Sequence, residues 1–239
     1  MSVGIVVGAG GGIGSACARA LDASADLTVL AGRSDPRLRA TASALTGRTA
    51  TVVADVATED GREAIARAAL DMGEIAWLIL ASGVPLRGAL MELTPDHIQK
   101  TLMTNLVGPT LLIRRLLDGR WLPNASIIAV GSISATRSLP NRSVYSGSKA
   151  GLEHLCRSLA AEVAPLGIRV NVVAPGVIDT PFLGGDQPAL QVWVSAHVPQ
   201  RQVGTPEDVA DVVRYLILEA PAYVTGARIA VDGGAESVS

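Results

Sequence analysis

The stretch SVGIVVGAGGGIG, residues 2–14, joins a short apolar run to a glycine-rich turn. Its glycines follow the spacing G-x-x-x-G-x-G at Gly8, Gly12 and Gly14, and Ile13 excludes the G-x-G-x-x-G pattern. Such a turn between a strand and a helix lets the backbone approach a pyrophosphate, and the free N–H groups of the helix attract its charge. Tight strand-to-helix packing would select the same glycines, so the surrounding pattern has to decide.

Short apolar runs alternate with longer helical patterns along almost the whole chain, and most runs are continuously apolar, as in strands covered on both faces. The predicted strands are 3–7, 27–31, 49–54, 75–81, 126–130, 168–173 and 228–231. The predicted helices are 13–24, 35–45, 58–71, 94–118, 144–164 and 206–218, two of which begin at the pairs Thr94-Pro95 and Thr205-Pro206.

This alternation predicts an α/β fold: a single-domain, Rossmann-like, doubly wound parallel sheet of about seven strands, with helices on both faces. The domain is expected to span residues 1–239, with an irregular, mobile flap at about 182–200. In this frame the glycine turn follows the first strand, which favours dinucleotide binding over a purely structural turn.

The composition excludes several classes of protein. The 239 residues are 49% apolar and 18% charged, which allows a large core. A net charge of -2 without any basic run argues against nucleic acid as a partner, and no apolar run approaches the ~18 residues of a membrane span. Cys17 and Cys156 fit neither a metal site nor a disulfide framework, and the N-terminus lacks the basic start of a signal peptide. We expect a cytoplasmic protein with no metal and no membrane partner.

The stretch YSGSK, residues 145–149, puts Tyr145 and Lys149 one helical turn apart on the same face. Lys149 and Lys100 are the only lysines among the 20 Lys and Arg residues. A phenol titrates near ~10, and a fixed ammonium beside it favours the phenolate. A compact ammonium can also serve a cofactor ribose, which a broad guanidinium fits less well. An ordinary helix pair would have the same spacing.

Further motifs surround this pair in a fixed order. Ser132 lies thirteen residues before Tyr145, at the end of the run SIIAVGS, and Asn105 lies twenty-seven residues before Ser132. The stretches NVVAPGVIDTP and YVTGARIAVDGG follow the predicted tyrosine helix. With these motifs the chain resembles the short-chain dehydrogenase/reductase family, from residue 3 to about residue 234.

The resemblance implies an NAD(P)-dependent oxidoreductase with four catalytic residues. Tyr145 would exchange a proton with the substrate oxygen, which Ser132 would hold and polarise. Lys149 would bind the nicotinamide ribose and lower the tyrosine pKa, and Asn105 would hold a water that links Lys149 to a proton relay. The implied cofactor contacts are Gly8, Gly12, Ile13, Gly14, Arg33, Asp55, Val56, Gly83, Asn105, Tyr145, Lys149, Pro175, Gly176, Ile178 and Thr180.

Two positions depart from the family pattern. The family's glycine loop usually begins with threonine, where this chain has Val7, and its Asn-Asn-Ala-Gly motif is replaced by Leu80-Ala81-Ser82-Gly83. In relatives the threonine bonds near the asparagine motif, so both partners of one polar contact are replaced. Losing both partners together can be nearly neutral. We interpret the change as an apolar repacking that leaves cofactor binding intact.

The end of the second predicted strand favours NADP over NAD. NAD-binding proteins place an acidic residue there to accept from the ribose 2′-OH, whereas this chain has Gly32 followed by Arg33. Arg33 offers a charge-assisted fork to a 2′-phosphate, and Asp35 looks like the start of the next helix. NAD remains possible, because Gly11 stands where many NADP-binding relatives have a second basic residue.

The expected substrate is a neutral ketone or secondary alcohol. The apolar flap residues expected at the pocket are Phe182, Leu183, Leu190, Val192, Trp193 and Val194, with Asp186 as the flap's only charged residue. Such a surface rewards apolar burial. Arg87 and Arg137 could instead pair with an acidic substrate, although a solvated loop arginine is the commoner case.

Two alternatives remain for the function. One is a 3-oxoacyl thioester reductase, and the other is a catalytically silent nucleotide-sensing protein of the same fold. The intact set of four catalytic residues argues against the silent protein. The resemblance also implies a homotetramer.

Overall fold

A computed structural model of the chain describes residues 1–181, 183 and 187–238, without the side chains of 187–189. Within these residues seven strands form one parallel sheet, in the order β3-β2-β1-β4-β5-β6-β7. The strands are β1 (Ser2–Val7), β2 (Leu27–Gly32), β3 (Thr49–Val53), β4 (Glu74–Leu80), β5 (Trp121–Val130), β6 (Arg169–Pro175) and β7 (Arg228–Val231). The strand order reverses between β1 and β4, and ligands of such sheets bind at the carboxyl ends beside this reversal.

The connections between these strands are mainly helical. The α-helices are α1 (Gly12–Ala20), α2 (Asp35–Ser43), α3 (Glu59–Leu70), α4 (Pro95–Leu102), α5 (Gly108–Leu116), α6 (Ser143–Val163), α7 (Gln187–His197) and α8 (Pro206–Leu218). Short 3₁₀ turns cover Leu90–Glu92, Ile133–Ala135, Ala164–Leu166 and Ala235–Ser237, and a π-helical turn covers Met103–Val107.

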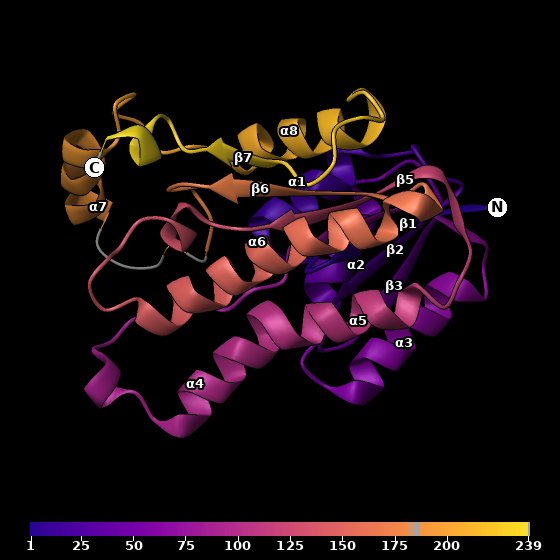
Figure 1. Cartoon of the computed structure of the whole chain (residues 1–239), viewed down its shortest axis with the longest axis horizontal. Coiled ribbons are helices and arrows are strands. Elements are labelled where there is room, and N and C mark those ends of the chain that lie inside the picture. The colour runs from indigo at the N-terminus through magenta and orange to yellow at the C-terminus, as the bar shows by residue number, and fades with distance from the viewer. Residues whose placement is uncertain (182, 184–186, 239) are drawn as a thin grey trace.

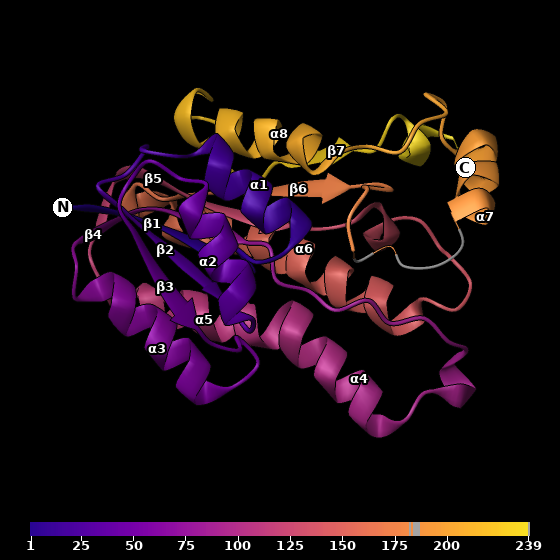
Figure 2. The ribbon, with the colours of Figure 1, turned by 180° about the vertical axis from the view of Figure 1, so that it is seen from behind.

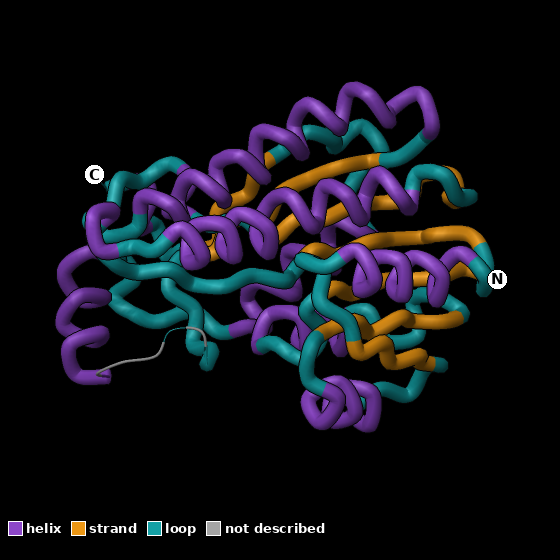
Figure 3. Tube along the Cα trace, turned by 90° about the horizontal axis from the view of Figure 1, so that it is seen from below, coloured by secondary structure: helices purple, strands orange, loops and turns teal. Residues whose placement is uncertain are grey.

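Helices cover both faces of the sheet, and each face has its own apolar cluster. One cluster joins alternate residues of β1, such as Ile5, to α3, α5 and α6, and α5 and α6 lie toward the viewer in Figure 1. The other joins residues of the opposite face, such as Val6, to α1 and α8, and α1 and α2 come forward in Figure 2. In Figure 3 the strands lie between these helical layers. The doubly wound sheet predicted from continuously apolar strands is confirmed.

Both predicted helix starts are also confirmed. The Thr94 side chain accepts from the backbone of His97 at the start of α4, and Thr205 forms a reciprocal capping box with Asp208 at the start of α8. The single helix predicted for 94–118 is instead two helices, α4 and α5, joined by the π-helical turn Met103–Val107. Pro109 accounts for the interruption, because a proline cannot donate to the carbonyl four residues before it.

The prediction of an irregular segment at 182–200 is wrong for residues 187–197, which form α7 (Gln187–His197). Leu190, Val194 and Val198 follow at four-residue spacing and pack with Ile133 in a small apolar cluster. Phe182 and Asp186, which were expected at the pocket, lie outside the described residues. Among the described helices, none combines the length and hydropathy that a membrane span requires.

Candidate active site

The glycine turn after β1 has the geometry of an anion cradle. Gly8 has a φ of +90°, and Gly11 donates to its carbonyl over 2.9 Å, which closes the turn directly ahead of α1. A Cβ on Gly14 would lie 2.2 Å from the Gly8 oxygen, so a side chain there would open the turn. Gly11 caps α1 without a side-chain hydrogen bond, and the first turn holds no acidic residue. The N–H groups of α1 are thus available to a pyrophosphate, as the spacing predicted.

The replacement of the family's asparagine motif after β4 is an apolar repacking at Val7 but leaves a polar group at Ser82. Val7 is 2% exposed and packs in the core, as expected for an apolar replacement. Ser82 lies against the turn, since a Cβ on Gly8 would come within 2.7 Å of its backbone nitrogen. Its hydroxyl is buried and has no hydrogen-bond partner among the described residues, which costs about 1–3 kcal/mol if it stays unpaired. A polar group of a bound dinucleotide would remove this cost, so the residues present fit the cofactor.

The predicted nicotinamide segment lies against the same glycine turn. A Cβ on Gly12 would lie 2.6 Å from Cγ2 of Thr180, so these two predicted contacts are neighbours. Gly176 packs on the backbone of Asp232, following Pro175 at the end of β6. Ile178 is 5% exposed and its side chain packs in the core, which leaves its backbone to face a ligand.

The predicted adenine pair follows β3. Val56 is buried in the core, and Asp55 is half-buried with Oδ1 accepting from Ala57 over 2.9 Å. Gly83 follows Ser82 after β4 and is half-buried. These residues lie at the carboxyl ends of their strands, where the sheet order places its ligands.

Two arginines, and not only the predicted Arg33, lie near the end of β2. Arg33 is exposed, and Asp35 begins α2 and pairs with Arg39 over 2.8 Å, as expected for a helix start. Arg37 was missed: its Cβ lies 3.0 Å from a Cβ built on Gly10, so this exposed arginine stands beside the glycine turn. The available signal was the position of Arg37 in the first turn of the predicted helix.

The predicted catalytic residues meet on α6 and β5. Tyr145, Ser132 and Lys149 are 6%, 8% and 4% exposed, and the side chains of Tyr145 and Ser132 are hydrogen-bonded. The Lys149 ammonium donates to the carbonyl of Val130 over 2.8 Å, at the end of β5. Burial lowers the pKa of Lys149 from 10.5 to about 8, although the carboxylate of Glu153 acts against this. The fold thus brings together Tyr145, Ser132 and Lys149, which the sequence spacing had grouped.

Several groups act on the pKa of Tyr145, and the expected effect of Lys149 on it stays a prediction. Burial raises the pKa of Tyr145, and the hydrogen bond with Ser132 and then the cation Arg142 lower it in part, while Glu153 raises it further. Arg142 is thus one cation that lowers the pKa of the phenol, and the sequence reasoning passed it over. Its position three residues before Tyr145, within one turn, was the available signal.

Asn105 lies in the π-helical turn and is fully buried. Its amide nitrogen donates to the Val84 carbonyl and to Ser148 Oγ, both over 3.1 Å, and its Oδ1 accepts from the Val84 backbone over 2.8 Å. Both amide protons are therefore used within the protein. Pro109 removes the usual donor to the main-chain carbonyl of Asn105, so a water held by this residue would bind that carbonyl.

A largely buried ionic network holds the backbone of Ser132, and the sequence reasoning missed this network. Glu153 accepts from the Ser132 backbone over 3.1 Å and from Arg228 over 2.6 Å. Arg228 also pairs with Glu236 over 2.7 Å, and Glu236 in turn accepts from the hydroxyl of Thr136. The network ties α6, β7 and the C-terminal 3₁₀ turn to the serine. Glu153 lies one turn after Lys149, but nothing in the sequence pointed to Arg228.

Arg142 lies near Tyr145, and Arg87 lies near Arg142. The guanidinium carbon of Arg142 is 5.9 Å from the tyrosine ring centroid, and burial and the charge of Arg87 lower the Arg142 pKa. Both arginines line a pocket of about 430 Å³. Arg137, the other arginine that the sequence singled out, donates instead to the Ala235 carbonyl over 2.5 Å.

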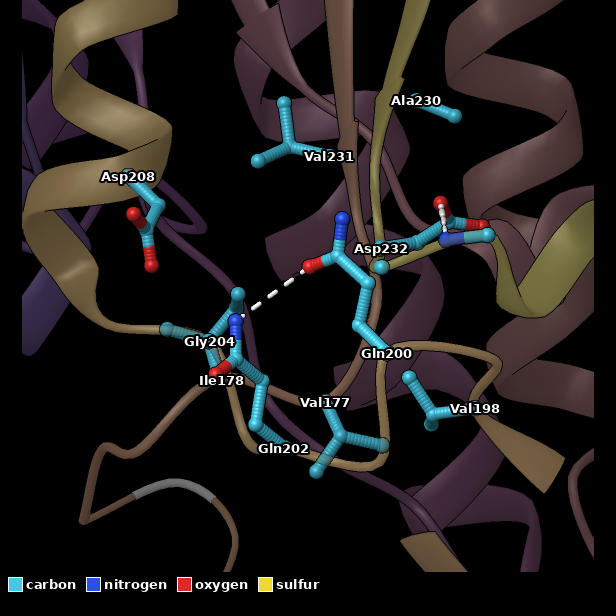
Figure 4. A pocket seen from close by; sticks show the side chains of 12 residues that line it. Val177, Ile178, Val198, Gln200, Gln202, Gly204, Asp208, Ala230, Val231 and Asp232 are labelled. Atoms are coloured by element: carbon cyan, nitrogen blue, oxygen red, sulfur yellow. Dashed lines mark hydrogen bonds between the residues drawn. The ribbon is translucent and has the colours of Figure 1, made fainter. Parts of the chain in front are cut away.

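A second pocket, of about 410 Å³, lies beyond the ends of β6 and β7 (Figure 4). Val177 and Ile178 line it from the β6 side and Asp232 from β7, while Gln200 and Gln202, whose amides are joined over 3.3 Å, line it ahead of α8. None of the four predicted catalytic residues lines this pocket. It lies next to the predicted nicotinamide segment and is separate from the tyrosine.

Known proteins share this architecture and these motifs. The family model described as enoyl-(acyl carrier protein) reductase matches residues 8–236. A 2-(R)-hydroxypropyl-CoM dehydrogenase of Xanthobacter autotrophicus is 35% identical over 97% of both chains. Protein FixR of Bradyrhizobium diazoefficiens is 46% identical over 58% of this chain, and the match spans about half (49%) of FixR.

Among solved structures, a 3-oxoacyl-[acyl-carrier protein] reductase from Brucella melitensis in complex with NAD superimposes with a TM-score of 0.92. That match has 28% identity and covers 100% of this chain and 98% of the other. The full-length relatives, the family model and the parallel sheet agree with the motif order read from the sequence. The chain belongs to the short-chain dehydrogenase/reductase family and is a nicotinamide-dependent oxidoreductase acting on a carbonyl/alcohol pair.

Proposed function

We propose that Tyr145 is the acid/base of this enzyme and that Ser132 holds the reacting oxygen of the substrate. The observation that carries the proposal is the buried, hydrogen-bonded Ser132–Tyr145 pair beside the buried ammonium of Lys149. When bound, the nicotinamide cofactor supplies or accepts the hydride. Burial keeps the phenol protonated to a higher pH, which is the form that donates a proton to a carbonyl oxygen.

The substitution Tyr145→Phe tests this role, because it removes one hydroxyl and little packing. We expect cofactor binding to survive, measured by the fluorescence of the reduced nicotinamide, and turnover to fall by more than tenfold. Lys149→Ala is expected to weaken both, since it removes the ammonium proposed to contact the ribose. A Tyr145→Phe enzyme with more than a tenth of wild-type turnover would refute the proton-transfer role.

We further propose NADP as the preferred cofactor. Arg33 and Arg37 stand on either side of the start of α2, both exposed, and Asp35 between them is paired with Arg39. Two guanidinium groups that form no ion pair with the described residues lie near the expected ribose and suit a 2′-phosphate, and no carboxylate at Gly32 repels it. Arg33→Asp should shift the ratio of kcat/KM toward NAD. A wild-type enzyme that prefers NAD by kcat/KM would overturn the proposal.

The argument for a neutral substrate loses four of the six apolar side chains on which it rested. It rested on apolar side chains of 182–200 facing the pocket, but Leu190, Trp193 and Val194 pack with Ile133, and Val192 is 72% exposed. A 3-oxoacyl thioester is a second candidate, favoured by the description of the matching family model and by the Brucella reductase. A kinetic panel of a neutral ketone, a keto acid of matched size and a 3-oxoacyl thioester separates these substrates.

We also propose a homotetramer in the cytoplasm. Leu111 on α5 and Leu166 after α6 are exposed large apolar residues on or beside the helices through which relatives commonly pair. Both cysteines are free and buried, and burial raises the pKa of each thiol to about 12, which fits a packing role in a reducing compartment. A light-scattering mass of one 24.5 kDa chain would refute the tetramer.

A further inference from the structure

The pocket that contains Arg87 and Arg142 is a built feature beside the reacting tyrosine. It has a volume of about 430 Å³ and lies between residues 87–92 and residues 140–142. The backbone of Gly88 donates to the Asn141 carbonyl over 2.9 Å, which holds the two segments together. Arg142 is the residue directly before α6, so the pocket opens at the N-terminus of the helix that carries Tyr145.

Arg142 stands where a cation is costly. It is half-buried, and it lies at the N-terminus of α6, where the helix dipole favours negative charge and disfavours a guanidinium. Arg87 adds a second positive charge in the same pocket. Among residues 1–181, 183 and 187–238, no carboxylate forms an ion pair with either arginine. The arrangement therefore lacks a negative charge that would balance it.

The acidic side chain in the pocket wall, Glu92, does not supply this charge. Glu92 lines the pocket, but it is exposed and makes no ion pair with either arginine. Two guanidinium groups and one carboxylate leave the described wall with a net positive charge. Arg137 differs, because the Ala235 carbonyl already binds it over 2.5 Å.

Accepting the roles proposed above for Tyr145 and Ser132, we infer that Arg142, with Arg87, binds an anionic group of the substrate. A guanidinium pairs in a two-pronged fashion with a planar carboxylate, and two of them can hold one such group from both sides. The guanidinium carbon of Arg142 lies 5.9 Å from the Tyr145 ring centroid, so a short substrate that meets the phenol through its carbonyl oxygen could reach Arg142 with an anionic group. The substrate class is thus a short keto acid or hydroxy acid, or a molecule with an equally compact anion.

The test compares keto acids with their methyl esters, which keep the ketone and lose the charge. Acetoacetate and levulinate, each beside its methyl ester, would be assayed with NADPH on four proteins: wild type, Arg142→Gln, Arg87→Gln and Arg157→Gln. The control Arg157 is exposed on the same helix, 15 residues or about 22 Å from Arg142. We expect wild type and the control to prefer the acid over its ester by at least tenfold in kcat/KM. Arg142→Gln should abolish that preference and Arg87→Gln should weaken it.

The outcomes separate this inference from the proposed function. If Arg142 acts only on the phenol, its substitution will lower kcat for acid and ester alike and leave their ratio unchanged, which overturns the inference. A wild-type preference for the esters overturns it as well and leaves the oxidoreductase intact. If the enzyme binds NADPH but turns over no member of the panel, a second assay follows the oxidation of NADPH with a neutral cyclic ketone as substrate and acetate as inhibitor. Inhibition by acetate that Arg142→Gln abolishes supports the inference. No inhibition of the wild-type enzyme by acetate overturns it. Failure on every ketone refutes the proposed function itself.

Discussion

Two arginines flank the Ser132–Tyr145 pair, and their surroundings are opposite. Arg228 is largely buried, pairs with Glu153 over 2.6 Å and Glu236 over 2.7 Å, and thereby supports the backbone of Ser132. Arg142 is half-buried beside the phenol and has no carboxylate partner in the described part of the chain. The charge of Arg87 lowers the pKa of Arg142 further.

The difference separates structural charge from functional charge. A buried charge with well-placed partners belongs to the folded scaffold, and removing one partner leaves the others unpaired. A cation that the fold leaves unbalanced lowers stability, and such conflicts concentrate at functional sites. The same residue type thus has two roles within one site, which measurements of stability and of activity should separate.

The largest expected effect is on stability. Arg228→Met should lower the free energy of unfolding by about 3–5 kcal/mol, because it leaves the buried Glu153 and the partly buried Glu236 without their cation. Arg142→Met should leave it unchanged or raise it, since that change removes an unbalanced charge. Urea unfolding of both variants and of Arg157→Met, an exposed control on α6, measures this. Equal losses in the Arg228 and Arg142 variants would remove the distinction between them.

Lys149 adds a third cation to the comparison and resembles Arg142 in lacking a carboxylate hydrogen bond among the described residues; it donates to the Val130 carbonyl. Its pKa falls from 10.5 to about 8 because burial disfavours the ammonium. Below about pH 8 the folded and unfolded states both hold the proton, and the folded state bears the full cost. Between about pH 8 and 10.5 the folded state releases it first, so the unfolding free energy should rise with pH, by about 3 kcal/mol in total.

The measurement is urea unfolding at several pH values between about 7 and 10.5, with Lys149→Met as the reference. The variant lacks the titrating group but keeps most of the packing. Wild type should gain stability relative to the variant as the pH rises through this window. A difference between the two proteins that stays constant with pH would show that Lys149 does not titrate differently in the folded state.

The fold was predictable because its signals are local. Continuously apolar strands imply a sheet covered on both faces, and Thr94 and Thr205 identify helix starts within a few residues. The helix α7 was missed because glycines and a proline in 184–188 indicated a loop. The four-residue spacing of Leu190, Val194 and Val198 was the opposing signal, and their packing on Ile133 decided the outcome.

The site was predictable only where its residues lie at fixed spacing. Tyr145 and Lys149 share a helix face, and Ser132 ends a recognisable apolar run. Glu153 and Arg228 are 75 residues apart, and the packing of α6 on β6 and the pairing of β6 with β7 bring them together. Likewise, the sequence could not separate Arg137, which a backbone carbonyl binds, from Arg142, which has no such partner among the described residues.

The smallest expected effect is on the pH dependence of alcohol oxidation, which needs the phenolate of Tyr145 as the base. Burial is the main reason for the raised pKa of Tyr145, with Arg142 lowering it and Glu153 raising it. Arg142→Gln should therefore move the rise of kcat/KM with pH to higher pH, and Glu153→Gln should move it to lower pH. The substrate should be a neutral secondary alcohol, so that binding of a substrate anion makes no contribution.

Arg157→Gln is the control and should leave the pH profile unchanged, because the charge of Arg157 lies far along α6 in solvent. Shifts of the same sign in the Arg142 and Glu153 variants would mean that structural disturbance, and not charge at the phenol, determines the profile.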